Sequence, residues 1–88
     1  MKVKKENKFE VNKNHYIEWG KSTWSNGADL SIRNKILNKK GKYNRISSSE
    51  ISWNDFNNMI IQSIKKSKFS DTELKEILFE LIKNIKND

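Results

Sequence analysis

Hydrophobic and polar positions alternate in the first part of the chain, as they do in strands that bury one face. Phe9 and Val11 alternate with polar neighbours, and the polar residues 12–14 have the composition of a turn. A second alternation runs over residues 15–19. The pattern therefore predicts two strands that pair as a hairpin.

Two further strands are predicted over residues 29–37 and 42–47, after turns at Asn26-Gly27 and at residues 38–41. In the third strand the apolar side chains fall on one face, namely Leu30, Ile32 and Ile36. The opposite face receives Ser31, Arg33, Lys35 and Leu37. We expect a sheet with one apolar face and one face that carries cations and the ring of Tyr43.

The period changes in the second half of the chain. Apolar residues recur every three or four positions, as in an amphipathic helix, at Trp53, Phe56, Met59, Ile60 and Ile64. The serines at 47–49 and the segment 52–55 both mark a helix start, and the second has capping-box form. Residues 70–73 form another capping box, which opens a second helix over 71–86.

These elements predict an α+β fold in which a four-stranded antiparallel sheet is followed by two helices packed on one face. We expect residues 1–8 to be a basic flexible arm and residues 9–69 to be the sheet-plus-helix domain. Residues 70–88 are expected to be a C-terminal amphipathic helix used for packing or dimerisation.

Composition limits the class of protein. Only 34% of the 88 residues are apolar, so the core is expected to be thin and completed by self-association or by a partner. The absence of cysteine excludes a disulfide scaffold, and the single histidine argues against a metal site. Without an 18-residue apolar run or a signal-like start, we expect a soluble cytoplasmic protein that does not bind membranes.

The charge of the chain is concentrated in its first half. Residues 1–46 contain ten lysines and two arginines against four acidic residues, a net charge of +8. Residues 47–88 contain six lysines against seven acidic residues, a net charge of −1. Lysine also serves solubility, but that role does not require the charge to gather in one half, so we favour a polyanion partner for the first half.

No pattern in the sequence points to catalysis. His15 lies in a strand pattern without a nucleophile motif nearby, and the acidic residues after position 54 fall on helix starts and faces. The three glycines, at 20, 27 and 41, are assigned to turns and form no phosphate loop. We therefore expect neither an enzyme nor a cofactor, and no small-molecule substrate.

Single-stranded nucleic acid requires cations for its phosphates and exposed rings on which bases stack. The candidate binding residues are Lys21, Trp24, Arg33, Lys35, Lys42, Tyr43 and Arg45. Each ring has a structural alternative: Trp24 as a loop anchor and Tyr43 as the cover of a sheet edge. Trp19, which shares a face with Ile17, is assigned to packing, and Arg33 could instead pair with Glu18 across strands.

Several spaced motifs resemble one known family. They are Phe9, Lys13-Asn14-His15-Tyr16-Ile17, Ile32-Arg33, Gly41, Ile46-Ser47 and Trp53-x-x-Phe56. In this order and spacing, over about 50 of 88 residues, they resemble the single-stranded-DNA-binding domain of the transcriptional coactivator positive cofactor four. Residues 41–46 are also similar to Pur-alpha repeats, and Pur-alpha and Whirly proteins are the weaker match.

The resemblance implies a twisted four-stranded sheet backed by a helix, a homodimer, and binding of melted or single-stranded DNA. It places Lys21, Trp24 and Gly27 in a nucleic-acid-binding loop and Arg33 in the binding face. The chain departs from the family pattern at Ile36, where the family has an aromatic residue, and at Asn44-Arg45, which replaces a Lys-Gly pair. The helix from residue 71 lies outside the resemblance.

Two functions are carried forward. The first is a homodimeric, sequence-tolerant protein that binds single-stranded DNA or RNA as an accessory factor in transcription or replication. The alternative is a small protein-interaction module, such as a phage- or plasmid-type inhibitor that docks on an acidic partner surface, for which the terminal amphipathic helix is suited.

Overall fold

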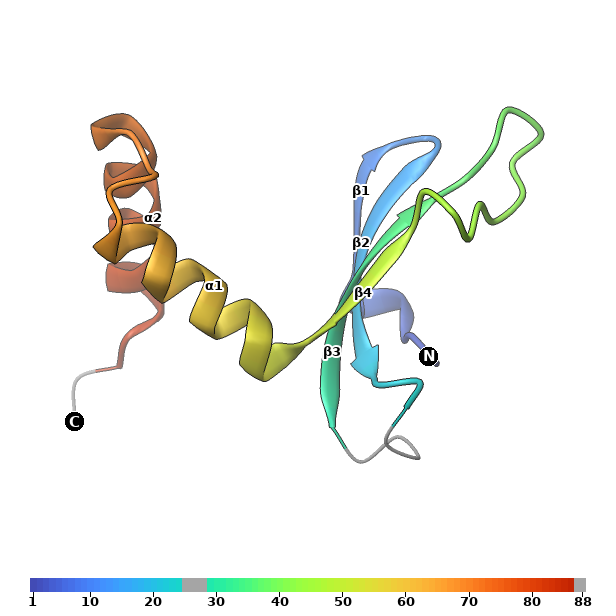
Figure 1. Cartoon of the computed structure of the whole chain (residues 1–88), viewed down its shortest axis with the longest axis horizontal. Helices are drawn as coiled ribbons and strands as arrows, with labels where there is room; N and C mark the ends of the chain where they lie inside the picture. The colour runs from blue at the N-terminus through green and yellow to red at the C-terminus, as the bar shows by residue number, and fades with distance from the viewer. Residues whose placement is uncertain (25–28, 87–88) are drawn as a thin grey trace. The chain divides into compact units, whose positions relative to one another are not determined.

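The computed structural model describes residues 1–24 and 29–86 and has the predicted order of a four-stranded antiparallel sheet followed by two helices (Figure 1). Its elements are a 3-10 turn Lys5–Asn7, the strands β1 Lys8–Asn12, β2 His15–Lys21, β3 Leu30–Ile36 and β4 Ser49–Ser52, and the helices α1 Trp53–Lys65 and α2 Asp71–Asn84. Two compact units divide the chain, residues 1–57 and 58–88.

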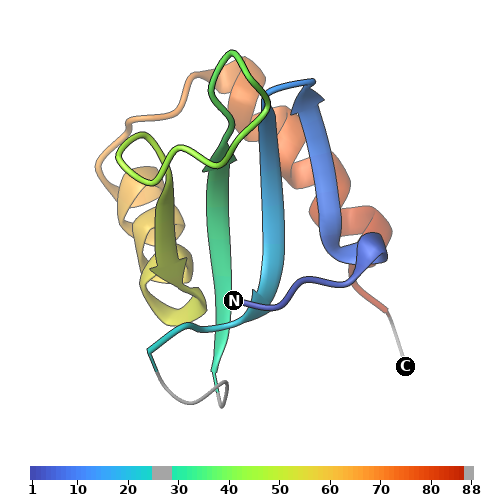
Figure 2. The same ribbon diagram turned by 90° about the vertical axis from the view of Figure 1, so that its right-hand side faces the viewer.

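The sheet is a simple meander in which every strand pairs with its neighbour in sequence, in the order β1-β2-β3-β4 (Figure 2). The turn between β1 and β2 is set by Asn12, whose side-chain Oδ1 accepts the backbone N–H of Asn14 at 2.9 Å. The predicted turn at Asn26-Gly27 lies outside the described residues.

The fourth strand is not where the sequence pattern placed it. Residues 42–47 form an irregular loop whose only ladder pairing among the described residues is an isolated bridge from Leu37 to Tyr43, and β4 begins at Ser49. Asparagine side chains explain the loop: Asn38 Oδ1 accepts the N–H groups of Lys40 and Lys42, and Asn44 Oδ1 accepts that of Ser47. These bonds occupy backbone groups that a strand would use.

The serines at 47–49, interpreted above as one helix start, therefore lead into a strand. The alternative start is confirmed: α1 begins at Trp53, and Ser52 Oγ accepts the N–H of Asp55 at 3.2 Å. Gly20 is likewise not a turn residue, because it lies inside β2. Gly41 is in a turn, with the positive φ of 77° that glycine tolerates best.

The register divides the sheet into the two predicted faces. Directly paired residues share a face, so Ile17, Trp19, Ile32 and Ile51 lie on one side. Glu18, Ser31, Arg33 and Glu50 lie on the other. No apolar residue in the described ranges is buried. The described residues therefore bury even less apolar surface than the thin core expected from composition.

The helical unit begins within α1 and contains α2. The capping box at residues 70–73 forms as predicted: Glu73 N–H donates to Ser70 Oγ at 3.1 Å, and Ser70 N–H donates to Glu73 Oε1 at 2.8 Å. The apolar stripe of α2 is largely exposed, with Leu78 at 54% and Ile82 at 60%.

Candidate nucleic-acid interface

The polar face of the sheet is organised around a buried carboxylate. Glu18 is only 1% exposed, and its Oε1 accepts hydrogen bonds from Arg33 Nη2 at 2.6 Å and Nε at 2.9 Å. Lys8 Nζ lies 3.8 Å from Glu18 Oε2. The pairing follows from the register, which sets Glu18 directly opposite Arg33. The alternative role of Arg33 as a cross-strand partner of Glu18 is therefore present in the structure.

Tyr43 joins this cluster from the loop after β3. Its ring centroid lies 5.4 Å from Arg33 Cζ and 5.6 Å from Lys35 Nζ, distances typical of cation–π contacts. The Asn44 N–H bond to Ile36 O, at 2.8 Å, holds the loop beside the strand end. Three predicted site residues, Arg33, Lys35 and Tyr43, are thus brought together, and Tyr43 keeps 42% of its surface exposed.

The strands of the polar face are nearly neutral in charge. Its cations are Lys8, Arg33 and Lys35, and its carboxylates are Glu10, Glu18 and Glu50, as the register assigns them. Most of the positive excess of the first half therefore lies in the segments that flank the strands. A polyanion would be attracted to those flanking segments more than to the middle of the sheet.

The predicted site residues separate toward the two ends of the strands. Lys21 pairs with Leu30 at the start of β3, and Trp24 lies in the turn that follows β2. Tyr43 pairs with Leu37 at the other end, where Lys42 and Arg45 are also exposed. The seven residue steps from Leu30 to Leu37 correspond to about 23 Å of extended chain between the two ends. Figure 2 shows the end of β2 and the loop after β3 at opposite ends of the sheet.

The end that carries Trp24 is fixed by a hydrogen-bond network. Thr23 donates its backbone N–H to Glu50 Oε2 at 3.0 Å and its hydroxyl to Glu50 Oε1 at 2.7 Å. Although partial burial alone would raise the pKa of Glu50, these bonds outweigh it and hold the pKa below its ordinary value. Glu50 therefore stays ionised and anchors the turn, while the Trp24 side chain remains 56% exposed.

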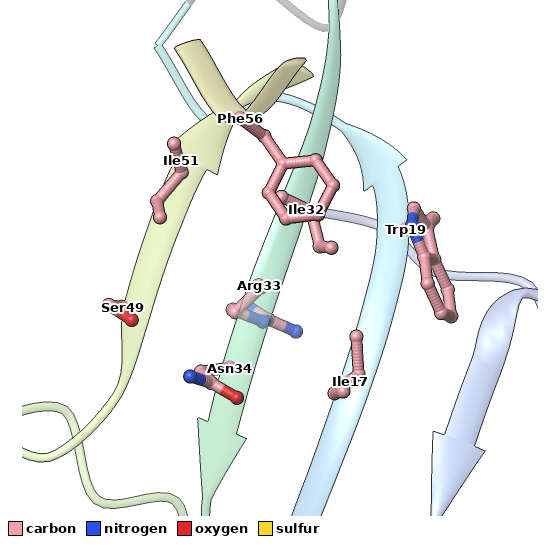
Figure 3. A pocket seen from close by; sticks show the side chains of 8 residues that line it. All are labelled: Ile17, Trp19, Ile32, Arg33, Asn34, Ser49, Ile51 and Phe56. Carbon is pink, nitrogen blue, oxygen red and sulfur yellow. The ribbon is translucent and has the colours of Figure 1, made fainter. Parts of the chain in front are cut away.

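The apolar face of the sheet carries a different feature, a hollow of about 270 Å³. Its lining consists of Ile17, Trp19, Ile32, Arg33, Asn34, Ser49, Ile51 and Phe56 (Figure 3). Phe56, from the first turn of α1, projects toward Ile32 and also lies 5.3 Å from the ring of Trp53. Trp19 lines this hollow together with Ile17, and its assignment to packing stays a prediction.

Two lysines that the sequence analysis assigned only to an arm also approach the candidate site. Lys2 and Lys4 line a groove with Lys21 at the end of β2. The sequence did contain a signal for this arrangement, because a glycine inside a strand often marks the close approach of another backbone segment. Gly20 is that glycine.

Comparison with protein-family models, with curated proteins and with solved structures finds no match to this chain. The resemblance to positive cofactor four thus remains an expectation from spaced motifs. Neither helix among the described residues is long and apolar enough to cross a membrane. In the same residues, no three His, Cys, Asp or Glu side chains gather in a way that could hold a metal ion.

Proposed function

We propose that this protein binds single-stranded nucleic acid with little sequence preference, as a homodimeric accessory factor in transcription or replication. The observation that supports the proposal is the pairing of exposed rings with cations at both ends of the sheet. Trp24 lies beyond Lys21 at one end, and Tyr43 lies between Lys42 and Arg45 at the other. Rings stack on any base and cations follow any phosphate backbone, so this combination favours sequence-tolerant binding.

The roles of the candidate residues differ. Lys21, Lys42 and Arg45 are exposed and would contact phosphates, and Trp24 and Tyr43 would stack on bases. Arg33 already donates to Glu18, so it would act by holding Tyr43 in place. Lys35 lies on the same ring and would share that role.

The first experiment measures binding of a labelled oligo-dT by fluorescence anisotropy across a series of salt concentrations. We expect log affinity to fall linearly with log salt, with a slope of about 0.7 for each phosphate neutralised. Trp24→Ala and Tyr43→Ala should each raise Kd about tenfold, because a stacked base contributes roughly 1–3 kcal/mol. Competition by single-stranded RNA and by duplex DNA would define the preferred nucleic acid, because RNA is distinguished through its 2′-OH groups.

Phe79→Ala is the matched control for those variants. Its ring is 63% exposed, as accessible as the other two, but it lies on α2 in the half of the chain that has no positive excess. We expect it to leave Kd unchanged. Affinity that ignores salt, or equal effects of all three ring variants, would contradict the proposal.

The alternative function, docking on an acidic protein surface, is favoured by the exposed stripe of α2, in which Leu78, Leu81 and Ile82 are each more than half exposed. The two functions separate when the protein is purified at low salt. Co-purified nucleic acid that is removed at high salt supports the first function. A preparation free of nucleic acid that also fails to bind oligo-dT supports the alternative.

A further inference from the structure

The segment before β1 lies against the sheet at Gly20. A Cβ atom placed on Gly20 would lie 2.5 Å from the carbonyl oxygen of Lys2, which is closer than packed atoms approach. The neighbour is backbone, so it cannot move aside as the tip of a side chain can. Glycine at position 20 therefore permits this approach, and Figure 2 shows the segment crossing the end of β2 before it reaches β1.

This approach creates a groove of about 520 Å³ between the segment and the strands. The segment contributes Lys2, Val3, Lys4 and Asn7, and the strands contribute Gly20, Lys21 and Leu30. All of these residues belong to the unit of residues 1–57. The groove is thus a property of that unit alone.

The groove combines positive charge with apolar surface. Lys2, Lys4 and Lys21 are exposed, and none of the ion pairs between described residues involves them. Glu6, the one acidic residue of the segment, does not line the groove. Val3 and the half-exposed Leu30 add apolar surface. Three like charges around one groove repel each other, and a bound anion would relieve that repulsion.

We propose that this groove is part of the binding site for single-stranded nucleic acid, with Lys2, Lys4 and Lys21 on phosphates and Val3 and Leu30 against a sugar or base. The inference rests on the proposed function and deepens it. An acidic peptide would satisfy the lysines but has no planar base for the apolar surface. The segment then acts as a fixed wall of the site, and Gly20 is the residue that makes this wall possible.

The experiment compares two kinds of variant in the full chain, with oligo-dT as the probe. Lys2→Gln/Lys4→Gln removes two charges and should raise Kd about fivefold or more near 0.1 M salt, with a salt slope lower by about 1.4. Gly20→Ala keeps every charge but displaces the segment, and it should raise Kd by a similar factor. Lys65→Gln/Lys66→Gln, at the end of α1, removes the same charge elsewhere and should change neither quantity.

The Gly20→Ala variant tests whether the segment before β1 must be held in place. If this segment were only a flexible basic tether, the variant would keep all of its charges and its Kd would not change. Circular dichroism shows whether this variant folds. If it does not, protection from amine acetylation in the unaltered protein replaces it. Bound oligo-dT should protect Lys2, Lys4 and Lys21 but not Lys65 and Lys66, and equal labelling with and without oligo-dT would overturn the inference.

The remaining outcomes distinguish the two proposals. If the unaltered protein binds oligo-dT and the groove variants match the Lys65/Lys66 control, the groove inference is wrong and the proposed function stands. If the unaltered protein binds neither oligo-dT nor a single-stranded RNA, the proposed function is wrong. Binding of poly-glutamate that weakens in the groove variants would then assign the groove to acidic proteins, which also overturns the inference.

Discussion

At the residue scale, Glu18 is the one charged side chain that is buried among the described residues. It is withdrawn from water at 1% exposure, and the Arg33 side chain that satisfies it is itself only 12% exposed. The second cation, Lys8, is more distant and far more exposed. Removing Arg33 would therefore leave a buried charge with one weak partner, which costs more than the pair itself contributes.

We expect Arg33→Ala to lower the free energy of unfolding by about 3 kcal/mol, because an unpaired buried carboxylate must be neutralised or hydrated. Urea titration followed by circular dichroism measures this change. Lys83→Ala, which breaks the exposed pair with Glu80 at 3.3 Å, is the matched control, expected to cost less than about 0.5 kcal/mol. Equal effects of the two substitutions would show that Glu18 is hydrated in solution.

This difference bears on how the binding face is tested. A loss of nucleic-acid affinity in Arg33→Ala would combine lost stability with lost contacts, so that variant is a poor probe of the interface. Arg45 is exposed on the loop after β3 and is the cleaner arginine for that purpose.

At the element scale, α2 depends on local signals more than on packing. Its stripe is exposed, so the capping box at Ser70 and Glu73 supplies a large share of what fixes its start. We expect Ser70→Ala to lower the free energy of unfolding of α2 by about 1 kcal/mol. The change is measured from thermal unfolding curves of the two proteins, recorded as the loss of ellipticity at 222 nm on heating.

Thr72→Ala, within the first turn but not at the cap, is the control for the capping prediction. This substitution should leave the melting temperature of α2 unchanged or raise it slightly, because alanine has a higher helix propensity than threonine. A larger loss for Thr72→Ala than for Ser70→Ala would contradict the assigned cap.

Elements with strong periodicity or caps were predictable from the sequence, and those governed by side-chain to backbone bonds were not. The strand around Ile32, the hairpin before it and both helix starts follow from alternation and capping boxes. The loop at 42–47 did not, because Asn38 and Asn44 take the backbone bonds that alternation alone assigns to a ladder.

The candidate site was predictable to a smaller extent. The alternation placed Arg33, Lys35 and Tyr43 on the face where the structure has them. It could not show that Glu18 is buried beneath Arg33, nor that Lys2 approaches Gly20, because both depend on contacts between distant segments. Charge counts by half of the chain also conceal that cations and carboxylates balance on the polar face of the sheet.

At the scale of the whole molecule, the main physical problem is uncovered apolar surface. No apolar side chain in the two described ranges is buried, Phe9 and Leu30 are about half exposed, and the α2 stripe is exposed from Leu78 onward. A folded chain of this size normally buries most of its large apolar side chains. A second copy of the chain would supply complementary apolar surface at equal stoichiometry, as the proposed homodimer requires.

The proposed dimer predicts stability that depends on protein concentration. For a folded dimer and unfolded monomers, Tm should rise by a few degrees for each tenfold increase in concentration, by mass action. Differential scanning calorimetry between micromolar and near-millimolar protein measures the shift, and sedimentation equilibrium gives the mass directly. A constant Tm together with a monomer mass would contradict the dimer.

The meander order of the strands also has a consequence for how the chain folds. Each strand pairs with the strand next to it in sequence, so the sheet forms through short-range closures and few long loops. Such topologies fold quickly for β-structure, and all four strands precede residue 53. During synthesis the sheet can therefore form before either helix has left the ribosome. Trp19, Ile32 and Ile51 then face solvent until two chains associate. Aggregation of the nascent sheet through this apolar face is the hazard that follows.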